Sequence, residues 1–274
     1  MNPTQTPPAH SRVGGVGAME LRVLGCHGGE TPHHRTSAFL LDQKLVIDAG
    51  ALTSTLALEE QYALEAAVVS HAHLDHVRDL ATLADNRCQA GCPPLPIGAT
   101  RRTIATLKKH FFNNRLWPDF SVIPSIARPT IRWVVVPAGE KPVQLGGYEI
   151  RGVPVSHTID TTALIVTGGG GSLAYSGDTG PTERLWEALA RQPDLRALIM
   201  EVSFPNREQR IASLSGHHTP RTLAADLRKL ARPKDLPTLL FHIKPRYQRE
   251  VERECAGLRG LNLTVLALED RIRF

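Results

Sequence analysis

The sequence predicts an α/β fold of four layers, αββα, in which two mixed β-sheets lie face to face and helices cover their outer sides. Two observations predict it. Short apolar segments typical of strands alternate with segments of helical periodicity along most of the chain. Several of the strand-like segments also end in a polar residue, as in layered α/β proteins, whose active sites collect side chains from strand ends at one rim.

Each strand is predicted from a short run of apolar or β-branched residues. In chain order these are Leu21–Leu24, Ala38–Leu41, Leu45–Ile47, Val68–Ser70, Val134–Val136, Tyr148–Val155, Thr162–Val166, Leu173–Tyr175, Leu198–Met200, Leu239–Phe241 and Thr264–Leu266. Helices are predicted from a 3.6-residue pattern, and several begin at Thr or Pro, which favour helix starts. They are Val77–Leu83, Thr103–His110, Thr182–Ala190, Pro220–Leu230 and Arg246–Cys255. This order of elements predicts the sandwich.

The first 17 residues lack apolar periodicity and contain Pro3, Pro7, Pro8 and the run Gly14-Gly15-Val16-Gly17. This composition predicts that residues 1–17 form a flexible tail. Residues 18–274 predict a single domain, because 274 residues with 42% hydrophobic content can bury one full core. The chain has no signal-peptide pattern at its start, and no stretch reaches the roughly 18 apolar residues that span a bilayer. We therefore expect a cytoplasmic protein with no membrane partner.

Four metal-binding side chains lie within the six-residue run His71-Ala72-His73-Leu74-Asp75-His76. The run follows the apolar residues 66–69, so we expect it at the end of a strand. Because side chains on a strand alternate between its faces, His71 and His73 should point the same way, and a turn beginning at Asp75 would direct Asp75 and His76 to a second ion. Imidazole and carboxylate ligands favour zinc, with manganese or iron as alternatives. A histidine-rich surface turn is the other interpretation.

Three isolated residues of the same chemistry follow later strand-like segments. They are His157, Asp178 and His242. Residues at strand ends of a layered α/β protein meet at one rim, so all seven side chains are expected to converge. An isolated histidine such as His242 is more often a hydrogen-bonded core or rim residue, so only the combination favours metal binding.

With these seven residues in this order and spacing, the chain resembles the metallo-β-lactamase superfamily along residues 19–274. The resemblance implies an αββα sandwich of metallo-β-lactamase type and a metallo-hydrolase domain. It implies one ion held by His71, His73 and His157. A second ion would be held by Asp75, His76 and His242, with Asp178 and a hydroxide bridging the two. Two divalent ions about 3.5–4 Å apart lower the pKa of bound water and clamp the attacking and leaving oxygens of a hydrolysis.

The stretch from His110 to Phe120, with its Phe-Asn and Trp-Pro pairs, resembles the insert of class II 3′,5′-cyclic-nucleotide phosphodiesterases. The stretches Glu201–Asn206 and Gly216–Pro220 resemble the same family. The resemblance implies a small anionic substrate, a 3′,5′-cyclic nucleotide, hydrolysed to the 5′-nucleoside monophosphate by bridging-hydroxide attack. Cyclic AMP is the expected nucleotide, and the sequence does not separate cyclic AMP from cyclic GMP. Asp79 and His218 depart from the family pattern, in which a small residue and an apolar residue are expected, and this leaves the subfamily and its substrate preference open.

Hydrolysis of a cyclic phosphodiester also needs a proton donor for the leaving 3′-oxygen. We expect Asp75 and His217 to be catalytic, with His217 as the donor. Alternatively, His217 orients the phosphate, or merely caps the helix that begins near Thr219. Asp48 is expected to orient a ligand histidine rather than to bind metal.

Three side chains of the insert are the predicted substrate contacts. Phe112 and Trp117 would form an apolar wall against a purine, and Asn113 would bond to its edge. Core packing is the alternative explanation for the aromatic residues.

The formal charge of +5 and the pI of about 9.2 favour anionic substrates, nucleic acid included. A binuclear endoribonuclease of the transfer-RNA 3′-processing type is therefore one alternative function, and the only one with a nucleic-acid partner. It is disfavoured because the sequence shows no long Gly/Pro-rich arm for gripping RNA. A thioester or lactam hydrolase is a second alternative, since acyl centres use the same hydroxide. A non-enzymatic binding module would require loss of a ligand, yet all seven positions are filled.

The four cysteines are too few and too scattered for a disulfide framework, so we expect reduced thiols. Cys88 and Cys92 leave open a small additional metal clip. Both a monomer and a homodimer are compatible with the sequence.

Overall fold

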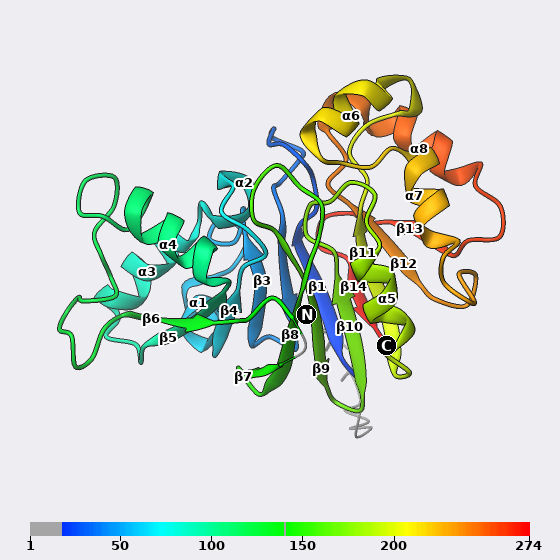
Figure 1. Ribbon diagram of the computed structural model, residues 1–274. Helices are drawn as coiled ribbons and strands as arrows, with labels where there is room; N and C mark the ends of the chain where they lie inside the picture. The colour runs from blue at the N-terminus through cyan, green and yellow to red at the C-terminus, as the bar shows by residue number, and fades with distance from the viewer. Residues whose placement is uncertain (1–17, 140) are drawn as a thin grey trace, which may run out of the picture.

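The structure is a computed structural model, and it describes residues 18–139 and 141–274. The predicted flexible tail, residues 1–17, lies outside the described residues. Within them, the elements form two seven-stranded sheets with helices on both outer sides (Figure 1).

The first sheet has the strand order β14-β1-β2-β3-β4-β5-β6. Its strands are β1 (Glu20–Gly25), β2 (Ala38–Leu41), β3 (Leu45–Ala49), β4 (Ala66–Val68), β5 (Leu95–Ala99), β6 (Ile131–Val135) and β14 (Arg271–Arg273). Strands β3 to β6 run parallel to one another, whereas β14, β1, β2 and β3 pair antiparallel. The sheet is therefore mixed, as predicted.

The second sheet has the order β13-β12-β11-β10-β9-β8-β7. Its strands are β7 (Val143–Leu145), β8 (Tyr148–Pro154), β9 (Thr162–Gly168), β10 (Gly171–Tyr175), β11 (Leu195–Glu201), β12 (Thr238–Phe241) and β13 (Leu263–Val265). Strands β10 to β13 are parallel, and β7 to β10 are antiparallel. Because β8 therefore runs in the direction of β10 and β12, the carboxyl ends of these three strands lie on the same edge.

Helices form the two outer layers. They are α1 (Leu58–Ala63), α2 (Leu74–Val77), α3 (Leu80–Gln89), α4 (Arg101–His110), α5 (Arg184–Ala190), α6 (Gln209–Ser215), α7 (Pro220–Leu227) and α8 (Gln248–Ala256), with short 3₁₀ helices η1 (Asn206–Glu208) and η2 (Pro245–Tyr247). Helices α1, α3 and α4 lie outside the first sheet, and α5 to α8 lie outside the second (Figure 1). Among the described residues, no helix is long and apolar enough to cross a bilayer.

The core has three layers of apolar side chains that follow the alternation of the strands. In β3, Leu45 and Ile47 face the second sheet, while Val46 faces the helices on the other side. In β11, Ile199 faces the first sheet and Met200 faces the outer helices. Each such side chain contributes about 1.5–3 kcal/mol on burial, so strands buried on both faces fix the rim at which they end.

The structure differs from the predicted elements at several points. Strand β5 was not predicted, because Pro96 and Gly98 interrupt its apolar run. The edge strands β7 and β14 and the short helices α1 and α6 also lack a predicted counterpart. The predicted helix Val77–Leu83 is two helices, α2 and α3, which are separated at Arg78 and Asp79.

Candidate metal centre

The six-residue motif lies in a loop and a helix start rather than on a strand. Strand β4 ends at Val68, two residues before the end of the predicted strand, so the alternation argument for His71 and His73 does not apply. His73 is instead the residue preceding α2, and Asp75 and His76 lie within that helix rather than in a turn. The four side chains nevertheless converge, because the loop and the first turn of α2 fold over the end of the first sheet.

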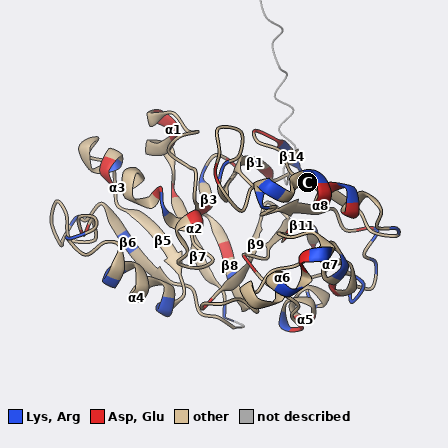
Figure 2. Ribbon diagram, turned by 90° about the horizontal axis from the view of Figure 1, so that it is seen from above, with Lys and Arg blue, Asp and Glu red and all other residues tan. Residues whose placement is uncertain are grey.

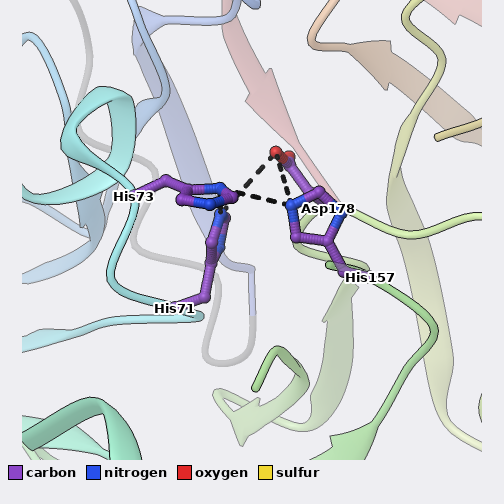
Figure 3. A group of neighbouring side chains, drawn as sticks. All are labelled: His71, His73, His157 and Asp178. Atoms are coloured by element: carbon purple, nitrogen blue, oxygen red, sulfur yellow. Dashed lines mark hydrogen bonds and ion pairs between the residues drawn. The ribbon is translucent and has the colours of Figure 1, made fainter. Parts of the chain in front are cut away.

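One group of donor atoms consists of three imidazole nitrogens and a carboxylate oxygen (Figure 3). His73 Nδ1 lies 3.1 Å from His71 Nε2 and 3.2 Å from His157 Nε2. Asp178 Oδ2 lies 3.7 Å from His71 Nε2 and 3.9 Å from His157 Nε2. The residues of the first predicted ligand set therefore come together from the segments that follow β4, β8 and β10.

A second group forms on the other side of Asp178. It contains Asp75, His76 and His242. His242 Nε2 lies 3.3 Å from Asp75 Oδ2 and 3.3 Å from Asp178 Oδ2. His76 Nε2 lies 3.3 Å from Asp178 Oδ1. Asp178 thus lies within 4 Å of histidines from both groups.

The spacing and the unsatisfied atoms of this cluster fit divalent metal. Donors about 2.0 Å from a tetrahedral zinc ion lie roughly 3.3 Å from one another, close to the separations found here. Two atoms that face each other, His76 Nε2 and Asp178 Oδ1, are buried and have no hydrogen-bond partner among the described residues. Buried polar atoms without a partner are costly, and a cation held between these two would satisfy both.

Hydrogen bonds behind the histidines direct their lone pairs into the centre. His76 Nδ1 lies 2.7 Å from Asp48 Oδ2, and His157 Nδ1 lies 2.9 Å from the carbonyl oxygen of Gly216. Each acceptor calls for a proton on Nδ1, which leaves the Nε2 lone pair free to bind metal. Asp48 is fully buried and was predicted to orient a ligand histidine, and the structure places it in contact with His76.

Asp48 is itself held from three sides. The Ser70 backbone N–H and hydroxyl donate to its carboxylate, both at 2.7 Å, and the Tyr175 hydroxyl donates at 2.6 Å. Ser70 Oγ also lies 2.9 Å from His71 Nδ1. One buried carboxylate therefore orients histidines of both donor groups, His76 directly and His71 through Ser70.

At the C-terminal end of β11 in the second sheet, Ser203 and Glu201 form hydrogen bonds that orient His242, as Asp48 and Ser70 do for His76 and His71. Ser203 Oγ donates to Glu201 Oε2 at 3.0 Å and lies 2.9 Å from His242 Nδ1. Neither Glu201 nor Ser203 was predicted to contribute to the site. Both residues closely follow the predicted strand Leu198–Met200. Polar residues after a predicted strand were the pattern that identified His157, Asp178 and His242, and the same pattern could have identified this pair.

Burial and charge set the protonation states of the centre. Burial lowers the pKa of His71, His73, His157 and His242, which keeps these rings neutral and able to bind metal. Burial alone would raise the pKa of Asp178, but the surrounding histidines hold it well below the usual value. Burial also lowers the pKa of His76, yet the carboxylates of Asp178 and Asp48 raise it well above normal. The position between those carboxylates therefore favours positive charge.

His217 lies beside both groups. Its ring stacks on His242 with centroids 5.2 Å apart and meets His157 edge-on at 5.0 Å. His217 Nδ1 lies 3.2 Å from Glu201 Oε1 and 3.2 Å from Ser203 Oγ. Helix α7 is capped by Thr219, whose side chain accepts from Thr222 N, so the capping interpretation of His217 is wrong.

The three predicted substrate contacts are not brought to the metal cluster. Phe112 is 1% exposed and packs in the core between the first sheet and its helices. Trp117 packs against the same core and donates its indole N–H to the Ala81 carbonyl at 3.0 Å. The Asn113 amide is used within its own turn, donating to Lys109 O and accepting from Leu116 N. The turn that follows α4 lies at the outer edge of the molecule (Figure 1), so core packing is the explanation that fits the aromatic residues.

The two departures from the family pattern have structural roles. Asp79 accepts from the backbone N–H and the hydroxyl of Thr53, at 2.8 and 3.0 Å, and so ties the loop after β3 to the start of α3. His218 is buried, and its Nδ1 lies 3.0 Å from Thr222 Oγ1 at the start of α7. All four cysteines are free thiols, as expected.

Comparisons with known proteins agree with this geometry. A family model described as "Beta-lactamase superfamily domain" matches residues 45–243, which include all seven donor residues. A probable 3′,5′-cyclic-nucleotide phosphodiesterase of Yersinia pestis is 30% identical over 281 residues, covering 85% of this chain and 80% of that protein. A 3′,5′-cyclic-nucleotide phosphodiesterase of Aliivibrio fischeri is 29% identical over 277 residues, covering 83% of this chain and 82% of that protein.

Two further similar proteins bear on the fold and on the endoribonuclease alternative. The crystal structure of unliganded yeast PDE1 matches with a TM-score of 0.76 at 19% identity, covering 93% of this chain and 99% of that one. A ribonuclease Z of Brevibacillus brevis is 38% identical over 81 residues, which are 30% of this chain and 24% of that protein. The matches to the two bacterial phosphodiesterases extend over most of both chains, while the ribonuclease match is local.

Proposed function

This chain belongs to the beta-lactamase superfamily, and from that membership we propose that it is a metal-dependent hydrolase of 3′,5′-cyclic nucleotides, cyclic AMP first among them. The predicted superfamily and its sandwich fold are confirmed. The observation that carries the proposed reaction is that Asp178 belongs to one donor group and lies 3.3 Å from His76 and from His242 of a second, because two adjacent groups suit two divalent ions. The substrate class is supported by the long matches to named phosphodiesterases.

The residues would divide as follows. His71, His73 and His157 would hold one ion. Asp75, His76 and His242 would hold the other, and Asp178 would contact both. Imidazole and carboxylate donors favour zinc over magnesium or calcium. When bound, two such ions lower the pKa of a water molecule and stabilise charge on the phosphoryl oxygens.

The proton transfers of the reaction would be carried out by side chains of the protein. The Asp75 side chain is 29% exposed, whereas those of His71, His76, Asp178 and His242 are at most 2% exposed. Burial alone would raise the pKa of Asp75, but its hydrogen bond with His242 holds the pKa well below the usual value and keeps the carboxylate ionised. In that form it can accept a hydrogen bond from the attacking water. As the bond between phosphorus and the 3′-oxygen breaks, His217 would give that oxygen a proton. The products are then a free 3′-hydroxyl and a 5′-monophosphate.

Glu201 supports the proton transfer. Burial raises the pKa of Glu201 to about 7, and its Oε1 lies 3.2 Å from His217 Nδ1. Burial lowers the pKa of His217 to about 4, so its protonated form is a strong donor. A neighbouring carboxylate that titrates near neutrality can return a proton to the imidazole between turnovers.

Product analysis tests the proposed function. Purified, metal-replete protein should convert cyclic AMP to 5′-AMP, detected by chromatography. Asp178→Asn should abolish the conversion, whereas Asp235→Asn, the same change on an exposed loop, should not. Formation of 3′-AMP, or cleavage of precursor transfer RNA far faster than cyclic AMP, would instead support the endoribonuclease alternative. Turnover of thioesters or lactams alone would support an acyl hydrolase.

A further inference from the structure

Lys244 is held next to the candidate centre by its backbone. It follows His242 by two residues, in the extended turn between β12 and η2. Its N–H donates to the carbonyl oxygen of Ser203 at 3.2 Å, and its own carbonyl accepts from Tyr247 N at 2.8 Å. Ser203 is also the residue whose hydroxyl contacts His242 and His217. The position of Lys244 is therefore fixed relative to both imidazoles.

The stem of Lys244 is packed against the loop that follows β1. Gly28 donates its backbone N–H to the Ile243 carbonyl at 3.1 Å. A Cβ added at Gly28 would lie 3.0 Å from Lys244 Cδ and 2.4 Å from the His242 carbonyl oxygen. The glycine thus allows the loop to approach the lysine stem closely. Lys244 is half-buried there, which restricts where its ammonium group can reach.

The charge of Lys244 is uncompensated by any carboxylate of the described chain. Lys44 pairs with Glu65 and Lys229 with Asp226, but Lys244 has no ion pair or side-chain hydrogen bond within the described residues. The same added Cβ at Gly28 would lie 2.9 Å from His242 Nδ1, so the lysine stem and the His242 ring both lie against this glycine. A half-buried lysine without a counter-ion, two residues after His242, is suited to an anionic ligand.

We propose that the Lys244 ammonium group binds a non-bridging oxygen of the scissile phosphate. Attack of hydroxide on a phosphodiester, which carries one negative charge, adds a second negative charge in the transition state. A fixed cation at that oxygen stabilises the added charge. Lys244 would then be a catalytic residue that contacts substrate. This inference rests on the proposed function only in requiring a phosphate ester as substrate; it is independent of the nucleotide.

Three variants test the assignment. Lys244→Met removes the charge and keeps the stem, Lys244→Arg keeps the charge, and Lys234→Met makes the same change at an exposed turn distant in sequence from the centre. We expect kcat/KM of Lys244→Met for cyclic AMP and for bis(p-nitrophenyl) phosphate to fall about 10- to 100-fold, the effect of one charge-assisted hydrogen bond. Lys244→Arg should retain most of the activity and Lys234→Met all of it.

Binding of inorganic phosphate to the metal-loaded protein, measured by calorimetry, supplies a readout other than turnover. Its affinity should fall in Lys244→Met by a similar factor, with metal content and melting temperature unchanged. Unchanged turnover and phosphate affinity in Lys244→Met would overturn the inference, as would equal losses in Lys244→Arg together with a lower melting temperature. If cyclic AMP is not hydrolysed but the bis(p-nitrophenyl) phosphate and phosphate results hold, the nucleotide assignment fails and the role of Lys244 stands.

Discussion

At the scale of single residues, the centre depends on which nitrogen of each histidine carries the proton. His76 and His157 each have an acceptor at Nδ1, Asp48 in one case and a backbone carbonyl in the other. His217 has Glu201 at the same nitrogen, and its donor atom lies in a third possible metal-binding group with Asp178 and His242. The same hydrogen-bond arrangement can therefore make a metal ligand or a proton donor, depending on what Nε2 faces.

His217→Ala tests the donor role. The variant should keep both metal ions and lose roughly 10²- to 10⁴-fold in kcat, the usual contribution of a general acid. Metal content, melting temperature and kcat are measured on the same sample. His110→Ala, at the exposed end of α4, is the matched control and should behave as wild type. Unchanged turnover in His217→Ala would remove this residue from the mechanism.

At the scale of elements, the sequence allowed the rim to be predicted but not the local path of the chain. His157, Asp178 and His242 could be found because each follows an apolar strand, and strands buried on both faces are strongly patterned. The loop at His71 and His73 could not, because the apolar run continues past Val68, where pairing of the strand stops. The contacts of Phe112 and Trp117 depend on packing against distant strands, which local pattern does not reveal.

Gly50 controls the position of α2. A Cβ at Gly50 would lie 2.0 Å from the carbonyl oxygen of Asp75, too close for any side chain. Gly50→Ala should therefore displace α2 and cost about 1–3 kcal/mol of stability, as overpacking does. It should also weaken binding of the second proposed ion, for which Asp75 and His76 are the candidate ligands. Thermal unfolding and metal titration measure the two effects.

Gly257→Ala is the matched control for that change. Gly257 ends α8, has φ of −77°, and a Cβ there would lie 3.4 Å from its nearest neighbour, an ordinary contact. Its stability should change by no more than about 0.5 kcal/mol. Equal stability and metal affinity in both glycine variants would show that Gly50 does not position α2.

At the scale of the whole molecule, the centre joins the two halves of the sandwich. His71 to His76 come from the first sheet and its helix α2, whereas His157, Asp178 and His242 follow strands of the second. Metal binding is therefore expected to stabilise the packing of one sheet on the other. Basic and acidic residues are interspersed on helices α7 and α8 (Figure 2). Although the chain has a net charge of +5, these two helices therefore do not form a uniformly basic surface.

Elemental analysis of metal-replete protein tests the central claim most directly. We predict close to two transition-metal ions per chain in the wild type, because two donor groups meet at Asp178. Asp178→Asn should lose most of one ion, since the amide keeps the shape of the side chain but not its charge. Saturation of the wild-type protein at one ion, or at none, would contradict the binuclear centre.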